Sequence, residues 1–189
     1  MTQAQRLILD TAKVILVRNP FNDAPVGEIA VSSPLEIAAA ITRAKAAQSE
    51  FRHSTPAVRR AMLNALALEI AADAENLAKT ISSEMGKTIR EARNEVRRAQ
   101  NTLRLSGDAA TFLDGEALHC AIVEGGADRL ATITYEPVGV IGAITPFNYP
   151  LNLLCHKLGP AIAAGNAVVA KPSPKAPLAA ARLRELALK

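Results

Sequence analysis

The chain of 189 residues lacks the features that mark a secreted or membrane protein. Its two cysteines, Cys120 and Cys155, are too few for the disulfide framework of a small secreted protein. The opening segment, "MTQAQRLILDTAKV", has no long apolar region of the kind found in secretory signals, and no apolar run approaches membrane-spanning length. We therefore expect no membrane partner and a location in the reducing cytoplasm.

Aromatic residues, metal ligands and strong charge are also scarce. Aromatics make up 3% of the chain and there is no Trp, so the core must consist of Ala, Leu, Ile and Val. The three histidines are far apart and show no metal-ligand spacing with the cysteines, so we expect no metal site. The net charge of +4 is mild. The nearest approach to a basic stripe, residues 93–104, is typical of the solvated face of a helix, so we expect no nucleic acid partner.

The front of the chain predicts a short hairpin and then a helix. Residues 14–32 contain two β-branched runs around the turn sequence "NPFNDAP", which favours two strands. Residues 33–36, Ser-Pro-Leu-Glu, have the form of a capping box at a helix start. Apolar residues recur at helical spacing along the segment that follows, at Ile37, Ile41, Ala44 and Ala47.

Further helices are predicted up to about residue 115. Thr55-Pro56 starts the second helix, Asp73 marks a fresh turn within it, and Gly86 is a plausible stop. The next helix runs from about Thr88 to near Gly115. Its apolar face keeps a three-then-four spacing at Ile89, Ala92, Val96, Ala99 and Leu103.

The second half of the chain predicts a β-hairpin and then a parallel unit. Residues 119–136 favour a hairpin around Gly125-Gly126. After Pro137, the run "VGVIGAI" is typical of a strand buried on both faces of a parallel sheet. A helix from about Pro150 to Ala164 follows, which Pro160 should kink or end early. The strand "AVVAK" and the helical segment "SPKAPLAAARLRELALK" complete a βαβ unit with one more helix.

This order predicts an α/β fold with an incomplete sheet, because a doubly wound sheet needs more than two parallel strands. We divide the chain into a helical part with a leading hairpin (1–118), a protruding hairpin (119–136) and the start of a Rossmann-like unit (137–189). By pattern, the chain is the front portion of a larger protein, or a short protein completed by a partner.

The segment "EPVGVIGAITPFNYPLNLLCHKLGPAIAAGNAVVAKPSPKAPLAA" closely resembles the entry to the cofactor domain of the aldehyde dehydrogenase superfamily. The family pattern has an apolar strand, then Pro-aromatic-Asn-aromatic-Pro, and later a Gly-Asn and a Lys-Pro. Upstream, "RNPFNDAPVGEIAVSS" resembles the first hairpin of the family, and "SSEMGKTIREARNEV" resembles one of its helix junctions. The resemblance covers about residues 14–189 and implies the N-terminal part of that fold.

The resemblance implies oxidation of an aldehyde to a carboxylate with NAD or NADP. In this chemistry a cysteine thiolate attacks the carbonyl, hydride passes to the nicotinamide, and a glutamate activates water to hydrolyse the thioester. Asn148 falls on the oxyanion-hole donor. Without the family, an Asn that bonds its own loop would be the favoured interpretation. The family's nucleophile and general base lie beyond residue 189, and Cys155 is interpreted as a small buried hydrophobe, so this chain alone should be inactive.

The family positions for the cofactor fall on the strand ends. Ile144, Thr145, Pro146, Phe147, Lys171 and Ser173 are the expected cofactor-binding residues. Lys171 should bond the adenosine ribose at the carboxyl edge of the sheet, with a solvated surface lysine as the alternative. Many NAD-preferring relatives carry Glu where this chain has Pro174, followed by Lys175. Because such an acid repels a 2′-phosphate, we expect NADP to be tolerated or preferred.

The resemblance also suggests a substrate class. The motif is nearest to a subgroup that oxidises lactaldehyde, glyceraldehyde-3-phosphate or phosphonoacetaldehyde. Tyr149, Asn152 and His156 fall in the substrate tunnel of the family and are polar. Arg98 falls where phosphate-binding members hold an anion, a task that suits the guanidinium fork, although an exposed helix residue is the alternative. We expect a small, polar, anionic aldehyde.

Two further expectations concern partners. The hairpin at 119–136 resembles the ribbon that reaches a neighbouring subunit, which implies a homodimer or homotetramer of the intact protein. The alternative to an enzyme seen in part is a non-catalytic remnant that binds a partner or a nucleotide.

Overall fold

The structure, a computed structural model, describes residues 13–113 and 115–189. Residues 1–12, on which the expectation of a missing secretory signal mainly rests, lie outside the described residues. β1 (Val14–Arg18) and β2 (Pro25–Ala30) form the predicted antiparallel hairpin. The side chains of Asn19 and Asn22 each accept a backbone hydrogen bond in the connecting turn, which is how Asn stabilises such turns.

Four helices follow, and capping side chains set where three of them begin. They are α2 (Pro34–Phe51), α3 (Pro56–Ala72), α4 (Ala74–Met85) and α5 (Ile89–Ala110). The capping box predicted at Ser33 is confirmed, since the Glu36 carboxylate accepts the Ser33 backbone N–H at 2.7 Å. Gly86 ends α4 in the left-handed region, at φ 68°, as glycine at this position commonly does.

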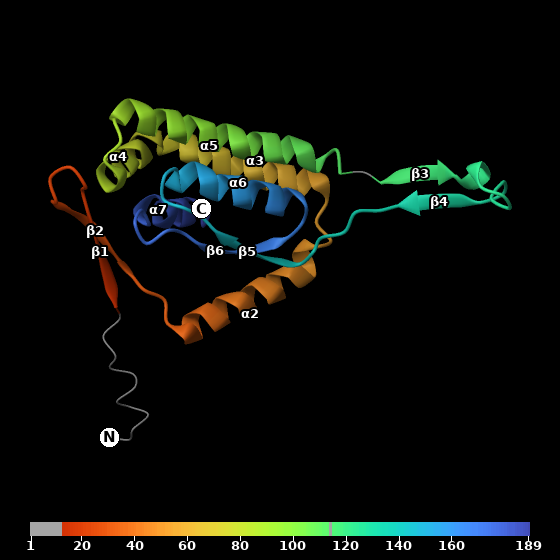
Figure 1. The fold of residues 1–189 in the computed structure, drawn as a ribbon, viewed down its shortest axis with the longest axis horizontal. Coiled ribbons are helices and arrows are strands. Elements are labelled where there is room, and N and C mark those ends of the chain that lie inside the picture. The colour runs from red at the N-terminus through yellow and green to blue at the C-terminus, as the bar shows by residue number, and fades with distance from the viewer. Residues whose placement is uncertain (1–12, 114) are drawn as a thin grey trace, which may run out of the picture.

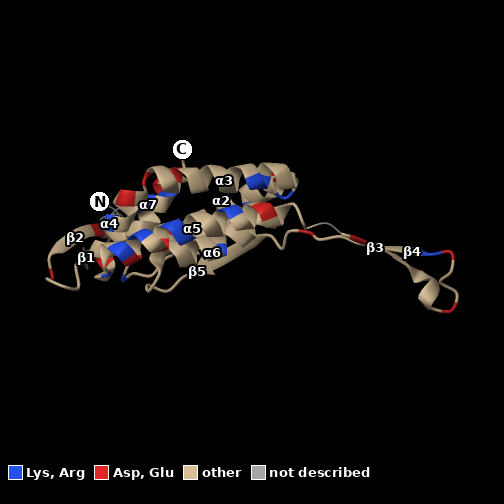
Figure 2. Cartoon of the chain, turned by 90° about the horizontal axis from the view of Figure 1, so that it is seen from above, with Lys and Arg blue, Asp and Glu red and all other residues tan. Residues whose placement is uncertain are grey.

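The predicted end of α5 near Gly115 is wrong. The helix ends at Ala110, because the backbone N–H groups of Thr111 and Phe112 bond carbonyls only three residues earlier and so tighten the last turn. The basic segment 93–104 lies within α5. Blue and red residues are interleaved over the helical body in Figure 2, and Arg93 is held by Glu75 through two hydrogen bonds.

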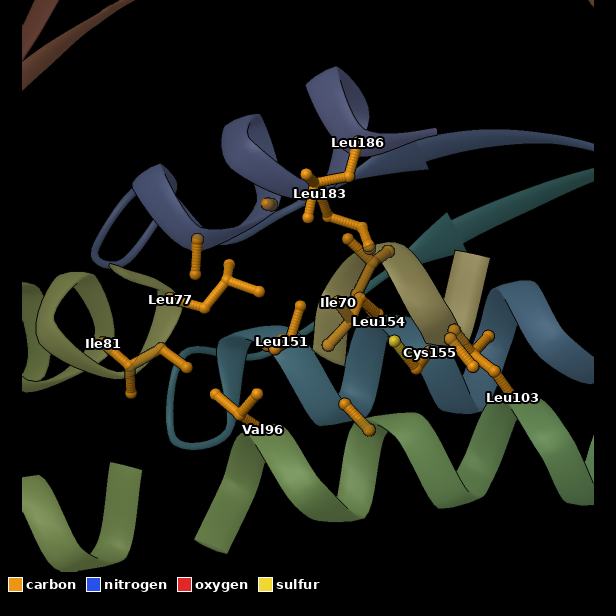
Figure 3. Close-up of a cluster of buried hydrophobic side chains, with 14 of the residues drawn as sticks. Ile70, Leu77, Ile81, Val96, Leu103, Leu151, Leu154, Cys155, Leu183 and Leu186 are labelled. Atoms are coloured by element: carbon orange, nitrogen blue, oxygen red, sulfur yellow. The ribbon is translucent and has the colours of Figure 1, made fainter. Parts of the chain in front are cut away.

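The core lies between α3, α4, α5, α6 (Pro150–Ala163) and α7 (Leu178–Leu186). It is aliphatic, as the composition predicted. Figure 3 shows its central side chains, which are Ile70, Leu77, Ile81, Val96, Leu103, Leu151, Leu154, Cys155, Leu183 and Leu186. Cys155 is fully buried among them, in agreement with its interpretation as a small hydrophobe. Pro160 is accommodated near the end of α6, which stops three residues later.

The predicted βαβ unit is present. β5 (Val140–Ile144) and β6 (Ala167–Lys171) pair in parallel, with α6 as the connection. In Figure 1, α2 lies on one side of this sheet and α6 on the other. The Gln48 side chain ties α2 to the sheet, since it donates to the Gly165 carbonyl at 3.0 Å and accepts from the Ala167 backbone N–H.

The prediction that the strand "VGVIGAI" is buried on both faces is wrong for this chain. Ala143 is the one residue of β5 that is buried, and Ile144 is 70% exposed. The sheet has two strands in the described residues, so the helices beside it cover it incompletely. The apolar run therefore predicts a strand correctly and its surroundings incorrectly.

The second hairpin projects from the end of the body opposite to β1 and β2 (Figure 1). It consists of β3 (Glu116–His119) and β4 (Leu130–Ile133), joined through the short 3-10 helix η2 (Cys120–Ile122). The predicted bounds, 119–136 with a turn at Gly125-Gly126, are corrected, because the first strand begins at Glu116 and a ten-residue loop separates the strands. Gly126 packs so closely on the Cys120 carbonyl that a side chain there would collide with it, which fixes the loop.

Two further findings concern membranes and metals. Within the described ranges, no helix is both long enough and apolar enough to cross a membrane. The same residues contain no cluster of three or more His, Cys, Asp or Glu side chains that could hold a metal ion.

Candidate functional site

The segment 145–149 joins the carboxyl end of β5 to the N-terminus of α6. Ile144 is paired with Lys171 in the sheet, and the Thr145 backbone N–H donates to the Lys171 carbonyl at 3.3 Å. Predicted cofactor residues from two separate segments thus meet at one edge. The Thr145 hydroxyl is buried and has no hydrogen-bond partner among the residues that the structure describes, and the Ile144 and Lys171 side chains are exposed. This edge is where open α/β sheets bind ligands.

Asn148 lies at the exposed part of this loop. Its side chain makes no hydrogen bond to any residue that the structure describes, so the structure does not hold it in a bond to its own loop. Phe147, beside it, is 42% exposed, and the Lys175 ammonium lies 4.9 Å from the centroid of its ring. The Ser173 hydroxyl accepts the Lys175 backbone N–H at 3.3 Å and is largely buried. The two loops at the carboxyl ends of β5 and β6 therefore touch each other.

The four predicted substrate residues are divided by the structure. The Arg98 guanidinium lies 5.6 Å from the centroid of the Tyr149 ring, so these two residues come together on the surface. His156 is exposed on α6. Asn152 is 2% exposed, and its amide oxygen accepts a hydrogen bond from the Thr102 hydroxyl at 3.2 Å. In this chain Asn152 thus joins α6 to α5.

Two residues beside this loop were missed in the sequence. The Lys87 ammonium lies 3.7 Å from the centroid of the Tyr149 ring and 2.7 Å from the Glu95 carboxylate. Glu95 is fully buried, and its second oxygen accepts the backbone N–H groups of Leu151 and Asn152 at 3.0 and 3.2 Å. The available signal was an acid on the apolar face of the α5 segment, three residues after Ala92. A charge at such a position needs a partner.

Cys155 cannot serve as a nucleophile in this arrangement. Burial in the core raises the pKa of its thiol to about 12, and the nearby charge of Glu95 adds to the effect. The thiol is therefore neutral at ordinary pH, whereas nucleophilic attack requires the thiolate. Cys120, the other cysteine, is partly exposed on η2 in the projecting hairpin.

The fold and this edge of the sheet can now be compared with known proteins. The model of the aldehyde dehydrogenase family matches residues 8–189. The chain belongs to the aldehyde dehydrogenase family. This confirms the resemblance and the fold class, with the first βαβ of a Rossmann-like sheet in an incomplete form.

Among curated relatives, 3-sulfolactaldehyde dehydrogenase of Priestia aryabhattai is 41% identical over 177 residues, which is 93% of this chain and 36% of the relative. Aspartate-semialdehyde dehydrogenase 1 of Pseudomonas canavaninivorans is 45% identical over 175 residues, 89% of this chain and 36% of the relative. This chain therefore spans about a third of the length of such relatives.

Solved aldehyde dehydrogenases have the same fold over this region. The NADP-dependent glyceraldehyde-3-phosphate dehydrogenase of Bacillus halodurans, complexed with NADP, has a TM-score of 0.90 at 33% identity, over 95% of this chain and 38% of that one. Betaine aldehyde dehydrogenase of Staphylococcus aureus, in complex with NAD⁺, has a TM-score of 0.86 at 29% identity, over 93% of this chain and 35% of that one.

Proposed function

We propose that this chain is the N-terminal part of an NAD(P)-dependent aldehyde dehydrogenase that oxidises a small, polar, anionic aldehyde to its carboxylate. The observation that carries the proposal is the exposed Asn148 amide, which has no partner among the described residues and lies in the loop that follows the carboxyl end of β5. A side-chain amide with free N–H groups in the loop between a strand and a helix can donate to an oxyanion. The nucleophilic cysteine and the general-base glutamate come from outside these 189 residues.

The edge formed by β5 and β6 fits a dinucleotide. The buried Thr145 hydroxyl lacks a hydrogen-bond partner within residues 13–113 and 115–189, and the exposed Lys171 ammonium can donate to ribose hydroxyls. When bound, the nicotinamide accepts the hydride. In this proposal Ile144 to Phe147, Lys171 and Ser173 would hold the cofactor, and Asn148 would donate to the developing oxyanion.

NADP is tolerated or preferred as the cofactor in this proposal. Pro174 stands where an acid would repel a 2′-phosphate, and Lys175 supplies a positive charge beside it. The ammonium of Lys175 lies over Phe147, within the same group of loops. We expect Lys175→Ala to lower kcat/KM with NADP and to leave kcat/KM with NAD nearly unchanged. Strict use of NAD by the intact enzyme would overturn this part.

An anionic substrate is supported by Arg98, whose guanidinium lies beside the Tyr149 ring at the surface. Relatives that act on sulfolactaldehyde, sulfoacetaldehyde and aspartate semialdehyde, each an aldehyde with an acidic group, agree with this class. In the intact enzyme, Arg98→Ala should raise KM for a phosphorylated or sulfonated aldehyde, whereas KM for propionaldehyde should stay nearly constant. An unchanged KM for the anionic aldehyde would refute the assignment.

The experiment that tests the proposed function begins with the gene beyond the codon for Lys189. A reading frame that supplies a cysteine nucleophile, and whose product forms NADPH or NADH when an aldehyde is added, is the expected result. A genuine stop after Lys189, with a stably folded 20.0 kDa product, would instead support the non-catalytic remnant.

Assembly and location belong to the same proposal. The hairpin of β3 and β4 extends well away from the body (Figure 1), and a two-stranded ribbon alone is marginal in water. We propose that it pairs with a neighbouring subunit in a homodimer or homotetramer. Two free cysteines agree with a cytoplasmic location. Sedimentation of the intact enzyme tests the assembly, and a monomer would contradict it.

A further inference from the structure

A buried carboxylate supports the loop that carries Asn148. The fully buried Glu95, on α5, accepts the backbone N–H groups of Leu151 and Asn152, which are in the first turn of α6. Tyr149, the residue before α6, has no side-chain cap of its own for this helix. Glu95 therefore supplies from another helix the acceptor that α6 lacks, and its negative charge lies at the positive end of the helix dipole.

Lys87 connects this carboxylate to the loop. Its ammonium lies 2.7 Å from Glu95 and 3.7 Å from the centroid of the Tyr149 ring, and its side chain is 16% exposed. A lysine held so close to both a carboxylate and a ring face attracts each of them. Tyr149 directly follows Asn148, so the ring that Lys87 contacts lies on the residue next to the donor and restrains the backbone there.

The position of Lys87 is itself fixed by its neighbours. Gly86 before it has φ 68°, and a side chain at Gly86 would meet the Pro20 ring at 2.8 Å. The Lys87 carbonyl accepts the Ser82 hydroxyl at 2.7 Å. Thr88 after it caps α5 through a reciprocal box with Glu91. The backbone on both sides of Lys87 is therefore held by helix ends.

We propose that Glu95 and Lys87 are positioning residues for the oxyanion donor, with Glu95 fixing the start of α6 and Lys87 fixing Tyr149 and, through it, Asn148. This rests on the proposed function, in which Asn148 contacts the reacting oxygen. Neither Glu95 nor Lys87 touches the substrate in this proposal. Their effect reaches the reaction through the loop alone.

Glu84 offers a matched control. It is 3% exposed, and its carboxylate accepts the backbone N–H groups of Leu178 and Ala179 at 2.7 and 3.0 Å, at the start of α7. Burial, helix capping and chemical group are thus the same as for Glu95. The helix is different, since the Glu84 carboxylate bonds the start of α7 and the Glu95 carboxylate bonds the start of α6. A general loss of stability would affect both carboxylates, whereas a positioning role belongs to Glu95.

Tyr149 can report on the loop directly. The chain has no Trp and two tyrosines, Tyr135 and Tyr149, so Tyr135→Phe leaves Tyr149 as the sole tyrosine reporter. Tyr135 is 62% exposed, outside the core. In this background, acrylamide quenching of tyrosine fluorescence and near-ultraviolet circular dichroism would be measured on the 189-residue chain. The variants are Glu95→Gln, Lys87→Met, Lys87→Arg and Glu84→Gln, compared under conditions where each is fully folded by far-ultraviolet circular dichroism.

We expect Lys87→Met to increase the population with an open loop about two- to fivefold, which is the effect of losing one cation–π contact. Glu95→Gln should change the population in the same direction, because it removes the charge that pairs with Lys87. Quenching of Tyr149 should rise accordingly, and its circular dichroism should weaken. Lys87→Arg keeps a cation beside the Tyr149 ring, so the quenching and the circular dichroism should stay near those of the parent protein. Glu84→Gln should also leave both signals unchanged. If a single variant does not fold, the double variant Lys87→Met/Glu95→Gln, which removes both charges together, gives the same readout. Unchanged Tyr149 signals, or an equal change with Glu84→Gln, would overturn the proposal.

The intact enzyme gives a second, separable readout. Lys87→Met should lower kcat more than it changes KM, because the donor acts mainly in the transition state, and Glu84→Gln should preserve both constants. An equal loss of kcat with both variants would also contradict a positioning role. If the intact protein oxidises no aldehyde while Tyr149 responds as expected, the loop is supported as described and the proposed function is wrong.

Discussion

Glu84 should make the folded chain less stable as the pH rises. Burial raises the pKa of its carboxyl from an ordinary value of 4.5 to about 7, and the charge of Glu95 acts in the same direction. The two backbone N–H groups at the start of α7 lower it only in part. Because the folded state binds the proton more tightly than the unfolded state, the stabilisation is complete below pH 4.5 and is lost as the pH rises through 7.

The size of the effect follows from the difference in proton affinity. Each tenfold difference corresponds to about 1.4 kcal/mol, so Glu84 accounts for at most about 3 kcal/mol across this interval. The side chain is 3% exposed, so solvent screens the effect little. In Glu84→Gln the neutral amide keeps an acceptor for one N–H group and does not titrate. The free energy of unfolding of this variant should therefore fall less between the two ends of the interval than that of the unmodified chain.

Urea denaturation followed by far-ultraviolet circular dichroism measures this difference. Unfolding free energies of the unmodified chain and of Glu84→Gln would be compared at pH 4.5 and pH 7.5, so that contributions common to the two proteins cancel. Asp73 has the opposite sign, because its bond to Arg182 lowers its pKa, and its contribution is lost below pH 3.8, outside the interval. The reasoning is refuted if both proteins show the same dependence on pH.

Three other predictions concern the core, an ion pair and the donor. Leu151→Ala should lower the free energy of unfolding by about 2–5 kcal/mol, since the side chain is fully buried in α6; urea denaturation checks this, and a loss under 1 kcal/mol would contradict it. Arg182→Ala removes two hydrogen bonds to the largely buried Asp73 and should cost about 1–2 kcal/mol, discounted because Arg182 is 36% exposed; the same assay should show a smaller cost at pH 3 than at pH 7, and equal costs would be evidence against it. In the intact enzyme, Asn148→Ala should lower kcat about 10²–10³-fold with little change in KM, and a mutant of normal kcat would remove Asn148 from the mechanism.

Local chemistry made much of the helical part predictable. Ser33 and Thr55 accept backbone hydrogen bonds from residues three positions ahead, and Gly86 adopts a left-handed conformation, so each signal acts within one turn of the chain. The aliphatic core followed from composition, and the strand of β5 from its apolar run. These features depend on few residues, all close in sequence.

Features that depend on distant segments were not predictable. The exposure of Ile144 reflects what lies beside the two-stranded sheet, which the run "VGVIGAI" does not contain. The role of Glu95 required knowledge that α6 packs on α5, because its backbone partners are 56 and 57 positions away. Within the candidate site, the family motif predicted the edge formed by Ile144, Thr145 and Lys171. The contacts of Lys87 and Glu95 with the neighbouring loop were found only in the structure.

The burial of Cys155 provides a built-in reporter of core opening. A thiol that is fully buried, with its pKa raised to about 12, reacts with an aqueous alkylating reagent only when α6 separates from α5 and the side chain meets water. Cys120 on the hairpin is partly exposed and reacts without such an opening. With Cys120→Ser, the rate of alkylation of the remaining thiol gives the frequency with which the helical layer comes apart in the native protein. A ligand or partner protein that binds over α5 and α6 would slow the alkylation of Cys155.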